Sequence, residues 1–459
     1  MKLILFNIGK WLILTLLILT HISCNEFLDA KPQISVNIPE TLSDLRLLLD
    51  DANTINQSAP GLIELGSDDY VVDYTVFTSR PMFEQQIYLW DNHPQFQLSD
   101  ISLQWSKPYR TILISNVVLE TLDRMNDVDN NLKNQLKGEA LFVKSFNYYI
   151  LSQIYSEPYV PNSKNDNLGV VYRPSSDFSE QSYRPTIANV YETILEELKQ
   201  GYELLPVQQI HKTRPDKQAA AALLARVYLS MENYEMALQY AEKALEYDNY
   251  LIDFNTLPIT TSNPLEVMGK EVIYHAICNT ASYITASRSN VAPSVYNSFD
   301  DNDLRKYLYF NAKANGTFSF KASHSGSSVM IFTGLAIDEL YFIQAECLAR
   351  MNNLKEALII MNKFLKLRWK SNTYLDFNSE DKLEVLKFIL KERRKGLIFR
   401  GIRWSDLRRL NRDDNFKVTL TRQFLNNTLT SELKPNDLRY TYLIPEEVIN
   451  MTGIQQNKR

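Results

Sequence analysis

The sequence has few of the residues, and none of the short motifs, on which the common classes of enzyme site are built. Among 459 residues there are five histidines, three cysteines and 13 glycines. It contains no Gly-x4-Gly-Lys phosphate loop, no dinucleotide glycine fingerprint, no His-Glu-x-x-His helix and no Gly-x-Ser-x-Gly elbow. We therefore predict no catalytic residue, no metal site and no cofactor.

The charge of the chain excludes a further class of partner. The formal net charge is -5 at pH 7. A protein that binds nucleic acid normally presents a net basic face to the phosphates. We therefore do not expect nucleic acid among the partners of this chain.

The composition instead favours a large helical protein. Glycine is scarce, whereas tyrosine, at 26 residues, is abundant, and 45% of the residues are hydrophobic. A chain of this length and hydrophobicity can bury a sizeable core, and scarce glycine favours helices over many tight turns. The fold class that we predict is mainly all-α.

The first 23 residues have the pattern of an export signal. Lys2 and Lys10 precede a continuous apolar run from Trp11 to Leu19. A charged start followed by a short apolar core is typical of a secretory signal. A single-pass membrane anchor is the alternative, since the segment 3–22 is almost long enough to span a bilayer.

The lone Cys24 at the end of this segment distinguishes the two interpretations, because an anchor needs no cysteine there. Cys24 resembles the cleavage cysteine of a lipoprotein, whose thiol carries lipid and becomes the first residue of the mature chain. His21 departs from that pattern, in which an aliphatic residue stands three places before the cysteine. We predict a lipoprotein signal peptide over 1–23 and lipidation of Cys24.

Only Cys278 and Cys347 remain beyond this anchor. Two cysteines do not make a disulfide framework, although an exported protein meets oxidising conditions in which one bridge can form. Cys347 lies in an apolar helical pattern, which favours a small buried side chain. The sequence leaves open whether the two are joined.

From Trp105 onward the apolar residues recur with the period of a helix. The segments 105–117, 137–155 and 186–205 each show this pattern, and the second is apolar nearly all round. Asn116 falls within the buried stripe of the first segment. These patterns predict successive helices packed against one another.

An internal repeat indicates how the helices pair. The segment from Ala225 to Leu245 aligns without gaps on the segment from Ala345 to Leu365, with small residues at matching places. This is the helix pair of a tetratricopeptide unit, with Asn233 and Asn353 where a turn glycine is usual. Because the copies lie 120 residues apart, we predict a tetratricopeptide-like scaffold of separated helical pairs.

Long insertions interrupt the helical pattern. They span residues 50–104, 156–184, 251–333 and 411–445, and are rich in proline, serine, asparagine and aromatic residues. Minor β-hairpins are expected there, for example at EVIYHAI over 271–277. Long ordered insertions on a rigid scaffold usually carry binding function.

Three charged clusters in the chain are assigned structural roles. The acidic run at 300–303 is interpreted as a solvated turn or helix start, and Asp68–Asp69 as a structural or binding turn. The arginines of the segment 389–412 alternate with apolar residues. We predict that they are buried or half-buried and pair with carboxylates and backbone carbonyls.

The aromatic residues of the insertions are the best candidates for ligand binding. Flat rings give stacking area, and amides, carboxylates and guanidinium groups bond to hydroxyl or peptide groups, a combination that suits sugars. For any one of them, packing in the core is the alternative role. The candidates are Tyr74, Tyr88, Trp90, Asp91 and His93 in the first insertion, and Tyr283, Arg288 and Tyr296 in the third.

Several blocks, in order along the chain, resemble the SusD/RagB family of outer-membrane nutrient-binding lipoproteins of Bacteroidetes. They are SCNEFLDAKP after the signal, WSKPYRTILISNVVLE, GEALFVKSFNYYILSQIYSEPYV, LAIDELYFIQAECLAR and ERRKGLIFRGIRWSDLRRL. Gly396 and Arg400 depart from the pattern, since family members commonly have glutamate there. The resemblance implies one SusD-like domain over 24–459, with an N-terminal half 24–210 and a C-terminal half 211–459 that contains the insertion 251–333.

The resemblance also implies a function. The chain would be a non-enzymatic lipoprotein on the exterior of the outer membrane that binds an oligosaccharide or peptide and delivers it to a SusC-like TonB-dependent barrel. Two alternatives remain open from the sequence: an exported glycan-processing enzyme and a tetratricopeptide-type scaffold that binds only protein partners.

Overall fold

The computed structural model describes residues 39–126, 128–279, 284–321, 323–424 and 429–459. Residues Thr41–Arg459 form one compact unit, to which the description below refers. The expected lipidation residue Cys24 and the candidate Tyr283 lie outside the described residues.

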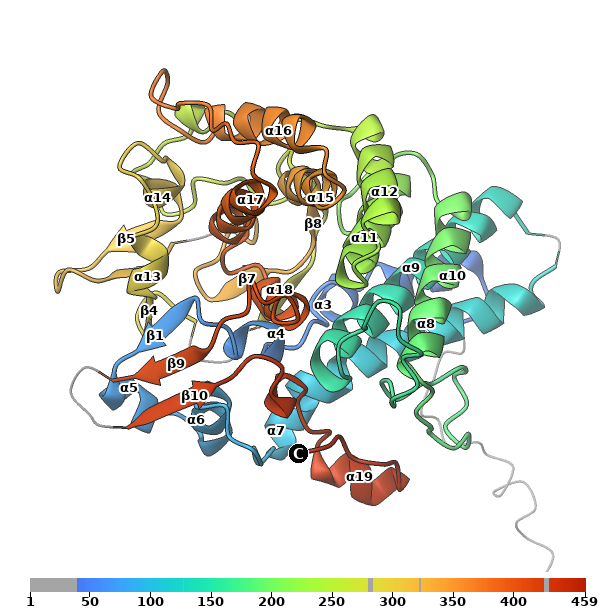
Figure 1. Cartoon of the computed structure of the whole chain (residues 1–459). Helices are drawn as coiled ribbons and strands as arrows, with labels where there is room; N and C mark the ends of the chain where they lie inside the picture. The colour runs from blue at the N-terminus through green and yellow to red at the C-terminus, as the bar shows by residue number, and fades with distance from the viewer. Residues whose placement is uncertain (1–38, 127, 280–283, 322, 425–428) are drawn as a thin grey trace, which may run out of the picture. The chain divides into compact units, whose positions relative to one another are not determined.

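A stack of long helices forms the scaffold (Figure 1). Neighbours in the stack pack as α8 on α9, α9 on α10, α10 on α11, α11 on α12, α12 on α15, and α15 on both α16 and α17. The mainly helical fold predicted from the sequence is confirmed. Bounds of the long helices are α8 Lys107–Arg124, α9 Asn130–Tyr155, α10 Ile187–Leu204, α11 Lys217–Ser230, α12 Tyr234–Tyr247, α15 Ile337–Arg350, α16 Leu354–Lys366, α17 Lys382–Gly396 and α18 Arg403–Leu410.

Short helices flank this stack. They are α2 Leu42–Leu49, α3 Ala52–Ile55, α4 Leu62–Leu65, α5 Tyr74–Thr78, α6 Met82–Tyr88, α7 Leu98–Ile101, α13 Pro293–Tyr296, α14 Arg305–Leu308 and α19 Glu446–Thr452. Among the described residues, none of the helices is long and apolar enough to cross a membrane.

The strands form antiparallel pairs: two pairs join consecutive strands within one insertion, as expected for minor hairpins, and the others join segments far apart in the chain. The pairs are β1 Tyr70–Val72 with β4 Ser289–Val291, β2 Val272–Tyr274 with β8 Leu335–Ala336, β3 Ile277–Asn279 with β7 Met330–Phe332, β5 Phe310–Ala312 with β6 Phe318–Phe320, and β9 Leu420–Gln423 with β10 Thr430–Leu433. Strands β2 and β3 confirm the expected β-pairing over 271–277.

The helical stripes predicted from the sequence are buried. Every residue of α9 from Gly138 to Tyr155 is buried, as a helix packed on several sides requires. The side chain of Asn116, also buried, donates to the carbonyls of Arg173 and Ser175 at 2.9 and 3.1 Å. This amide therefore fastens the insertion 156–184 to α8.

The two repeat copies are the helix pairs α11–α12 and α15–α16, and they are adjacent in space although 120 residues apart. The insertion 251–333 loops out between α12 and α15, which pack directly on each other. The left-handed turn residues are Glu232 and Asn352, with φ of 56° and 70°. Asn233, assigned to the turn from the sequence, is the last residue of the link from α11 to α12 and caps the start of α12, because its side chain accepts the N–H of Met236.

Buried arginine–carboxylate pairs tie α17 and α18 to the rest of the unit. Arg409 of α18 donates both Nη atoms to Glu346 of α15 at 2.6 and 2.8 Å. Arg393 donates to Asp406 at 2.8 Å, and Arg400 donates to both oxygens of Asp338. The predicted pairing of the 389–412 arginines with carboxylates is confirmed.

Arg408 takes the second predicted role, that of pairing with carbonyls. It is buried, and its guanidinium donates to the carbonyls of Ser152, Gln153 and Ser156 at the C-terminal end of α9. Carbonyls at the end of a helix lack hydrogen-bond partners within the helix. A cation there also interacts favourably with the negative end of the helix dipole. Burial lowers the pKa of Arg408 to about 10.

The acidic run 300–303 is only partly solvated, which corrects the interpretation from sequence. Asp303 is fully buried and accepts from Arg305 Nε and Nη2 at 2.9 and 2.7 Å, while Lys395 Nζ lies 3.1 Å away. Burial disfavours the charged carboxylate, but the two cations outweigh it and lower the pKa of Asp303. Arg305 follows the run closely, on α14, but Lys395 lies on α17, so the local sequence shows only one of the two cations.

We predict that Glu346→Ala destabilises the protein by about 3–5 kcal/mol, because it leaves the buried Arg409 guanidinium without its main partner. The change is measured as the midpoint of urea unfolding. Asp414→Ala, which removes an exposed pair with Lys417, is the matched control and should leave the midpoint nearly unchanged. Equal effects of the two variants would contradict the structural role of the buried pair.

Candidate functional site

Strand pairing between β1 and β4 brings the first and third insertions together (Figure 1). Val72 of β1 lies opposite Ser289 of β4, and Tyr70 lies opposite Val291. Tyr74, which follows β1, and Arg288, which precedes β4, therefore lie at the same end of this ladder. Two of the sequence candidates, 214 positions apart, become neighbours in this way.

Tyr74 begins α5 and is 37% exposed. Its ring meets the ring of Phe424 edge-on, with centroids 5.4 Å apart, and lies 6.1 Å from that of Phe77. Packing of this kind holds one side of the ring while leaving part of it open to solvent. Arg288, next to the same end of the ladder, is exposed.

Tyr296 is the third sequence candidate on this part of the unit. It ends α13, and its ring stacks on Phe318 of β6 with centroids 3.5 Å apart and planes 12° apart. Lys306 Nζ lies 5.0 Å from the centroid of the tyrosine ring. Both stacked rings are half-buried, so the pair offers a partly open aromatic surface.

A lysine fixes the strand that joins these groups. Lys313 Nζ donates to the carbonyl of Ser289 at 2.9 Å and to Oδ1 of Asn290 at 2.7 Å. Burial lowers the pKa of Lys313, and the carboxylate of Asp73 acts in the opposite direction. We call the surface formed by Tyr74, Arg288, Tyr296, Lys313 and Phe318 the insertion face.

Tyr88 and Trp90 lie in the core beneath this region, 2% and 3% exposed. The guanidinium of Arg422 lies 4.1 and 4.9 Å from their ring centroids and donates to the carbonyls of Ser67, Tyr70 and Tyr88. Trp90 Nε1 also donates to the carbonyl of Gly66 at 2.9 Å. The structure thus gives both rings a packing role and offers neither to a ligand as a stacking surface.

Asp91 and His93 lie apart from that core in an exposed turn. Asp91 Oδ1 accepts the backbone N–H of His93 at 2.8 Å, a bond that shapes the turn. His93 lines a hollow against the C-terminal segment. The eight sequence candidates are therefore divided among the insertion face, the core, this turn and the undescribed Tyr283.

Cys278 and Cys347 are free and buried, which answers the question that the sequence left open. Burial raises the pKa of both thiols, so neither has the character of a reactive thiolate. The prediction that Cys347 is a small buried side chain is confirmed.

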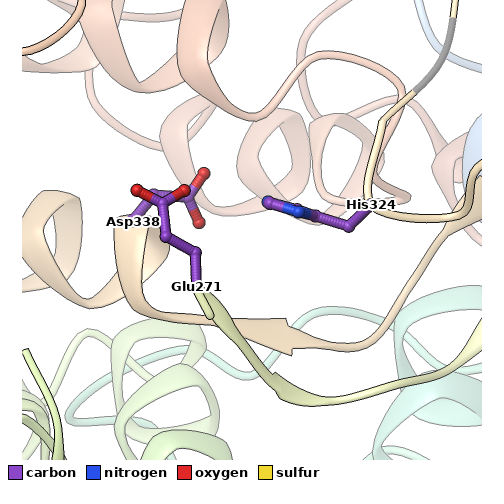
Figure 2. A group of neighbouring side chains, drawn as sticks. All are labelled: Glu271, His324 and Asp338. Carbon is purple, nitrogen blue, oxygen red and sulfur yellow. The ribbon is translucent and has the colours of Figure 1, made fainter. Parts of the chain in front are cut away.

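One group of side chains has the composition of a metal site. Glu271, His324 and Asp338 are buried, and one potential ligand atom of each lies within 4.8 Å of the others; Figure 2 shows the imidazole directed toward the two carboxylates. The sequence gives no sign of this group, because its residues come from three separate segments without a recognisable spacing.

The charges of this group are already balanced by arginines. Glu271 accepts from Arg368 at 2.6 Å, and Asp338 accepts from Arg400 at 2.8 and 2.7 Å. Burial, reinforced by the charge of Arg400, lowers the pKa of His324 to about 3. A cation here would have to compete with two buried guanidinium groups, so the arrangement fits a structural cluster better than a metal centre.

The replacement of Trp90 tests its assignment to the core. We predict that Trp90→Ala destabilises the protein by about 3–5 kcal/mol, because it removes a buried ring and frees space beside Arg422. Tyr74→Ala, at a partly exposed ring, should lower the thermal midpoint much less. Equal and small shifts for both variants would contradict the buried position of Trp90.

His324 should make stability depend on pH. Its native pKa of about 3 lies below its ordinary value of 6.5, so between these values the unfolded chain binds a proton that the native state does not. Stability is therefore retained above pH 6.5 and falls as the pH drops toward 3. His324→Gln should show a shallower decline of the urea midpoint between pH 6.5 and 4.5, and parallel curves for variant and wild type would contradict the assignment.

Comparisons with known proteins identify the relatives of this fold. Residues 26–229 match a family described as "Starch-binding associating with outer membrane", and residues 286–453 match the SusD family. SusD-like protein P2 of Formosa agariphila is 30% identical over 143 residues, which are 31% of this chain and only 26% of that protein. The alignment therefore spans about a quarter of that relative.

Solved structures share the architecture over nearly the whole chain. A SusD superfamily protein from Bacteroides thetaiotaomicron has a TM-score of 0.74 at 21% identity, covering 91% of this chain and 100% of that one. A SusD-like carbohydrate binding protein from Bacteroides vulgatus has a TM-score of 0.70 at 20% identity, covering 90% and 97%. At these identities the likeness shows a common fold. The two family matches together cover most of the chain and establish that it belongs to the SusD/RagB family.

Proposed function

We propose that the chain is a cell-surface nutrient-binding lipoprotein that captures an oligosaccharide or peptide and delivers it to a SusC-like TonB-dependent barrel. The family description supports sugar binding and association with the outer membrane. Within this proposal Cys24 carries the lipid, and the unit Thr41–Arg459 faces the exterior of the cell.

The observation that carries the binding function is the gathering of insertion aromatics by the β1–β4 pair. Tyr74, Tyr296 and Phe318 offer partly open rings, and Arg288 and Lys313 provide donors beside them. Rings flanked by hydrogen-bonding groups suit the apolar faces and hydroxyl groups of a sugar. An oligosaccharide is the favoured ligand, in keeping with the carbohydrate-binding relative from Bacteroides vulgatus.

The insertion face is open and only modestly buried, which sets the strength of binding that we expect. Few groups of a ligand would lose contact with water there, so the surplus of binding free energy over the cost of association is small. Reversible binding with a Kd in the micromolar range or weaker, and without turnover of the glycan, follows from this geometry.

We predict that Tyr74→Ala and Tyr296→Ala each weaken glycan binding by up to about tenfold, since each removes one aromatic contact. Binding is measured as retardation of the mature chain in gels that contain soluble polysaccharides. Tyr250→Ala, at a tyrosine 43% exposed beside Lys270, is the matched control and should migrate as the wild type does.

The same experiment includes the contradicting result. If the gel retards the wild type and retards both insertion-face variants as strongly as the wild type, the insertion face is not the glycan site. Thermal midpoints of the variants should lie near that of wild type, because both rings are partly exposed.

A further inference from the structure

A second hollow lies away from the insertion face, between residues 93–97 and residues 443–456 at the C-terminal end. Its volume is about 720 Å³, within the range of ligand sites in proteins. The first segment follows α6, and the second includes α19. We call this hollow the terminal groove.

Hydrogen bonds order the walls of the terminal groove, both between the two chain segments and within the C-terminal one. Arg459 Nε donates to the carbonyl of Asn92 at 2.8 Å, and its Nη1 donates to the carbonyl of Thr441 at 2.8 Å. The Gln456 side chain accepts from and donates to the backbone of Ile444, both at 2.8 Å. Such walls need little ordering when a ligand binds, which favours affinity.

Beneath these residues, the C-terminal segment is held to the helical stack. Asn457 Nδ2 donates to the carbonyls of Tyr155 and Tyr442, at 2.9 and 2.7 Å. Arg184 donates to the carbonyl of Gln455 and to Oδ1 of Asn457, both at 2.7 Å. The groove is therefore built on a rigid part of the unit.

An aromatic ring lies in the wall of the groove. Phe96 is half-buried and is supported from behind by Phe83, with centroids 4.6 Å apart. A ring held on one side and open on the other is a stacking surface for a flat apolar face, such as that of a pyranose.

Polar groups suited to hydroxyls surround this ring. Gln95, Glu446, Glu447 and Asn450 are exposed, and within the described part of the chain their side chains have no hydrogen-bond or ion-pair partner. Amides can both donate and accept, whereas carboxylates accept from hydroxyl groups. His93 adds an imidazole at the same rim.

The charge of the lining selects among sugars. Neither lysine nor arginine is among the described residues that line the groove, whereas Glu446 and Glu447 are. A uronate or a sulfated sugar would meet like charge from these two carboxylates. The insertion face differs in this respect, because Arg288, Lys306 and Lys313 lie there.

We infer that the terminal groove is a second carbohydrate-binding site, specific for uncharged sugar units. Phe96 supplies the stacking surface, and Asn450 and Glu447 bind hydroxyl groups. This inference rests on the proposed function, since it requires that the chain binds glycans. The terminal groove would bind either another stretch of the polysaccharide held at the insertion face or a second polysaccharide chain.

The test measures retardation of the mature chain in gels containing neutral polysaccharides, namely amylopectin, laminarin or mannan, or anionic ones, namely alginate or polygalacturonate. Asn450→Ala, Glu447→Gln and Phe96→Ala are compared with Ile359→Ala, at an exposed position of α16, as control. We expect each groove variant to weaken binding of a neutral polysaccharide by up to about tenfold, with the control unchanged. Asn450 and Glu447 are exposed, so these two variants keep the test valid if Phe96→Ala fails to fold.

Different failures have different meanings. If Tyr74→Ala or Tyr296→Ala weakens binding of neutral polysaccharides and Asn450→Ala and Glu447→Gln do not, the terminal groove is overturned and the proposed function stands. If only anionic polysaccharides retard the wild type, the inferred specificity of the terminal groove for uncharged sugars is contradicted, and the proposed glycan-binding function is kept. If no polysaccharide of the panel retards wild type, both the groove and the proposed glycan-binding function are contradicted.

Discussion

The pairing of buried arginines with carboxylates and carbonyls is the constraint on which the rest of this structure depends. A guanidinium group removed from water is costly unless its donors are satisfied, so each buried arginine requires a partner at a defined place. The residues 393–409 lie at the centre of this network. Arg400 and Arg409 pair with the start and the middle of α15, Arg408 bonds to the end of α9, and Arg403 pairs with Asp68 before β1.

This network fixes the insertion face as well as the helices. Asp68 and Asp69, which immediately precede β1, are held by Arg394 and Arg403. Arg422 then bonds to the carbonyls of Ser67 and Tyr70. Because β1 pairs with β4, the position of the third insertion is set by the same contacts. The proposed binding surface, carried by two long insertions, can in this way be as well ordered as the scaffold beneath it.

The departures of this chain from its family pattern also have a structural reason. At Gly396 a Cβ atom would lie 2.5 Å from Cε2 of Phe342, so the ring occupies the space that a larger side chain would need. Arg400, at the other departing position, pairs with Asp338 inside the unit. Both residues thus fit inside the unit, Gly396 by close packing against Phe342 and Arg400 by a buried ion pair with Asp338.

The sequence predicted what depends on local periodicity and missed what depends on distant partners. The stripe of α10, which includes Val190, Tyr191 and Leu198, is visible as a helical repeat and is buried as expected. Buried Tyr88 packs against Arg422, more than 300 positions away, and buried Asp303 pairs with Lys395 as well as with Arg305. The contact of α12 with α15 likewise could not be predicted from the sequence, because an insertion of 83 residues separates the two helices. Within the candidate site, residue type alone singled out Tyr74, which is partly exposed, while the joining of two insertions needed the β1–β4 register.

The proposed role in uptake combines an anchored binder with a transporter in the same membrane. The most direct measurement is purification of the full-length lipidated protein from its native outer membrane in mild detergent, with identification of its companions by mass spectrometry. A Cys24→Ser variant, which lacks the thiol that would carry the lipid, serves as the control. The account predicts that a TonB-dependent barrel co-purifies with the wild type and that the variant is lost from the membrane fraction. Lipidated protein that is recovered without any such barrel would contradict delivery to a transporter.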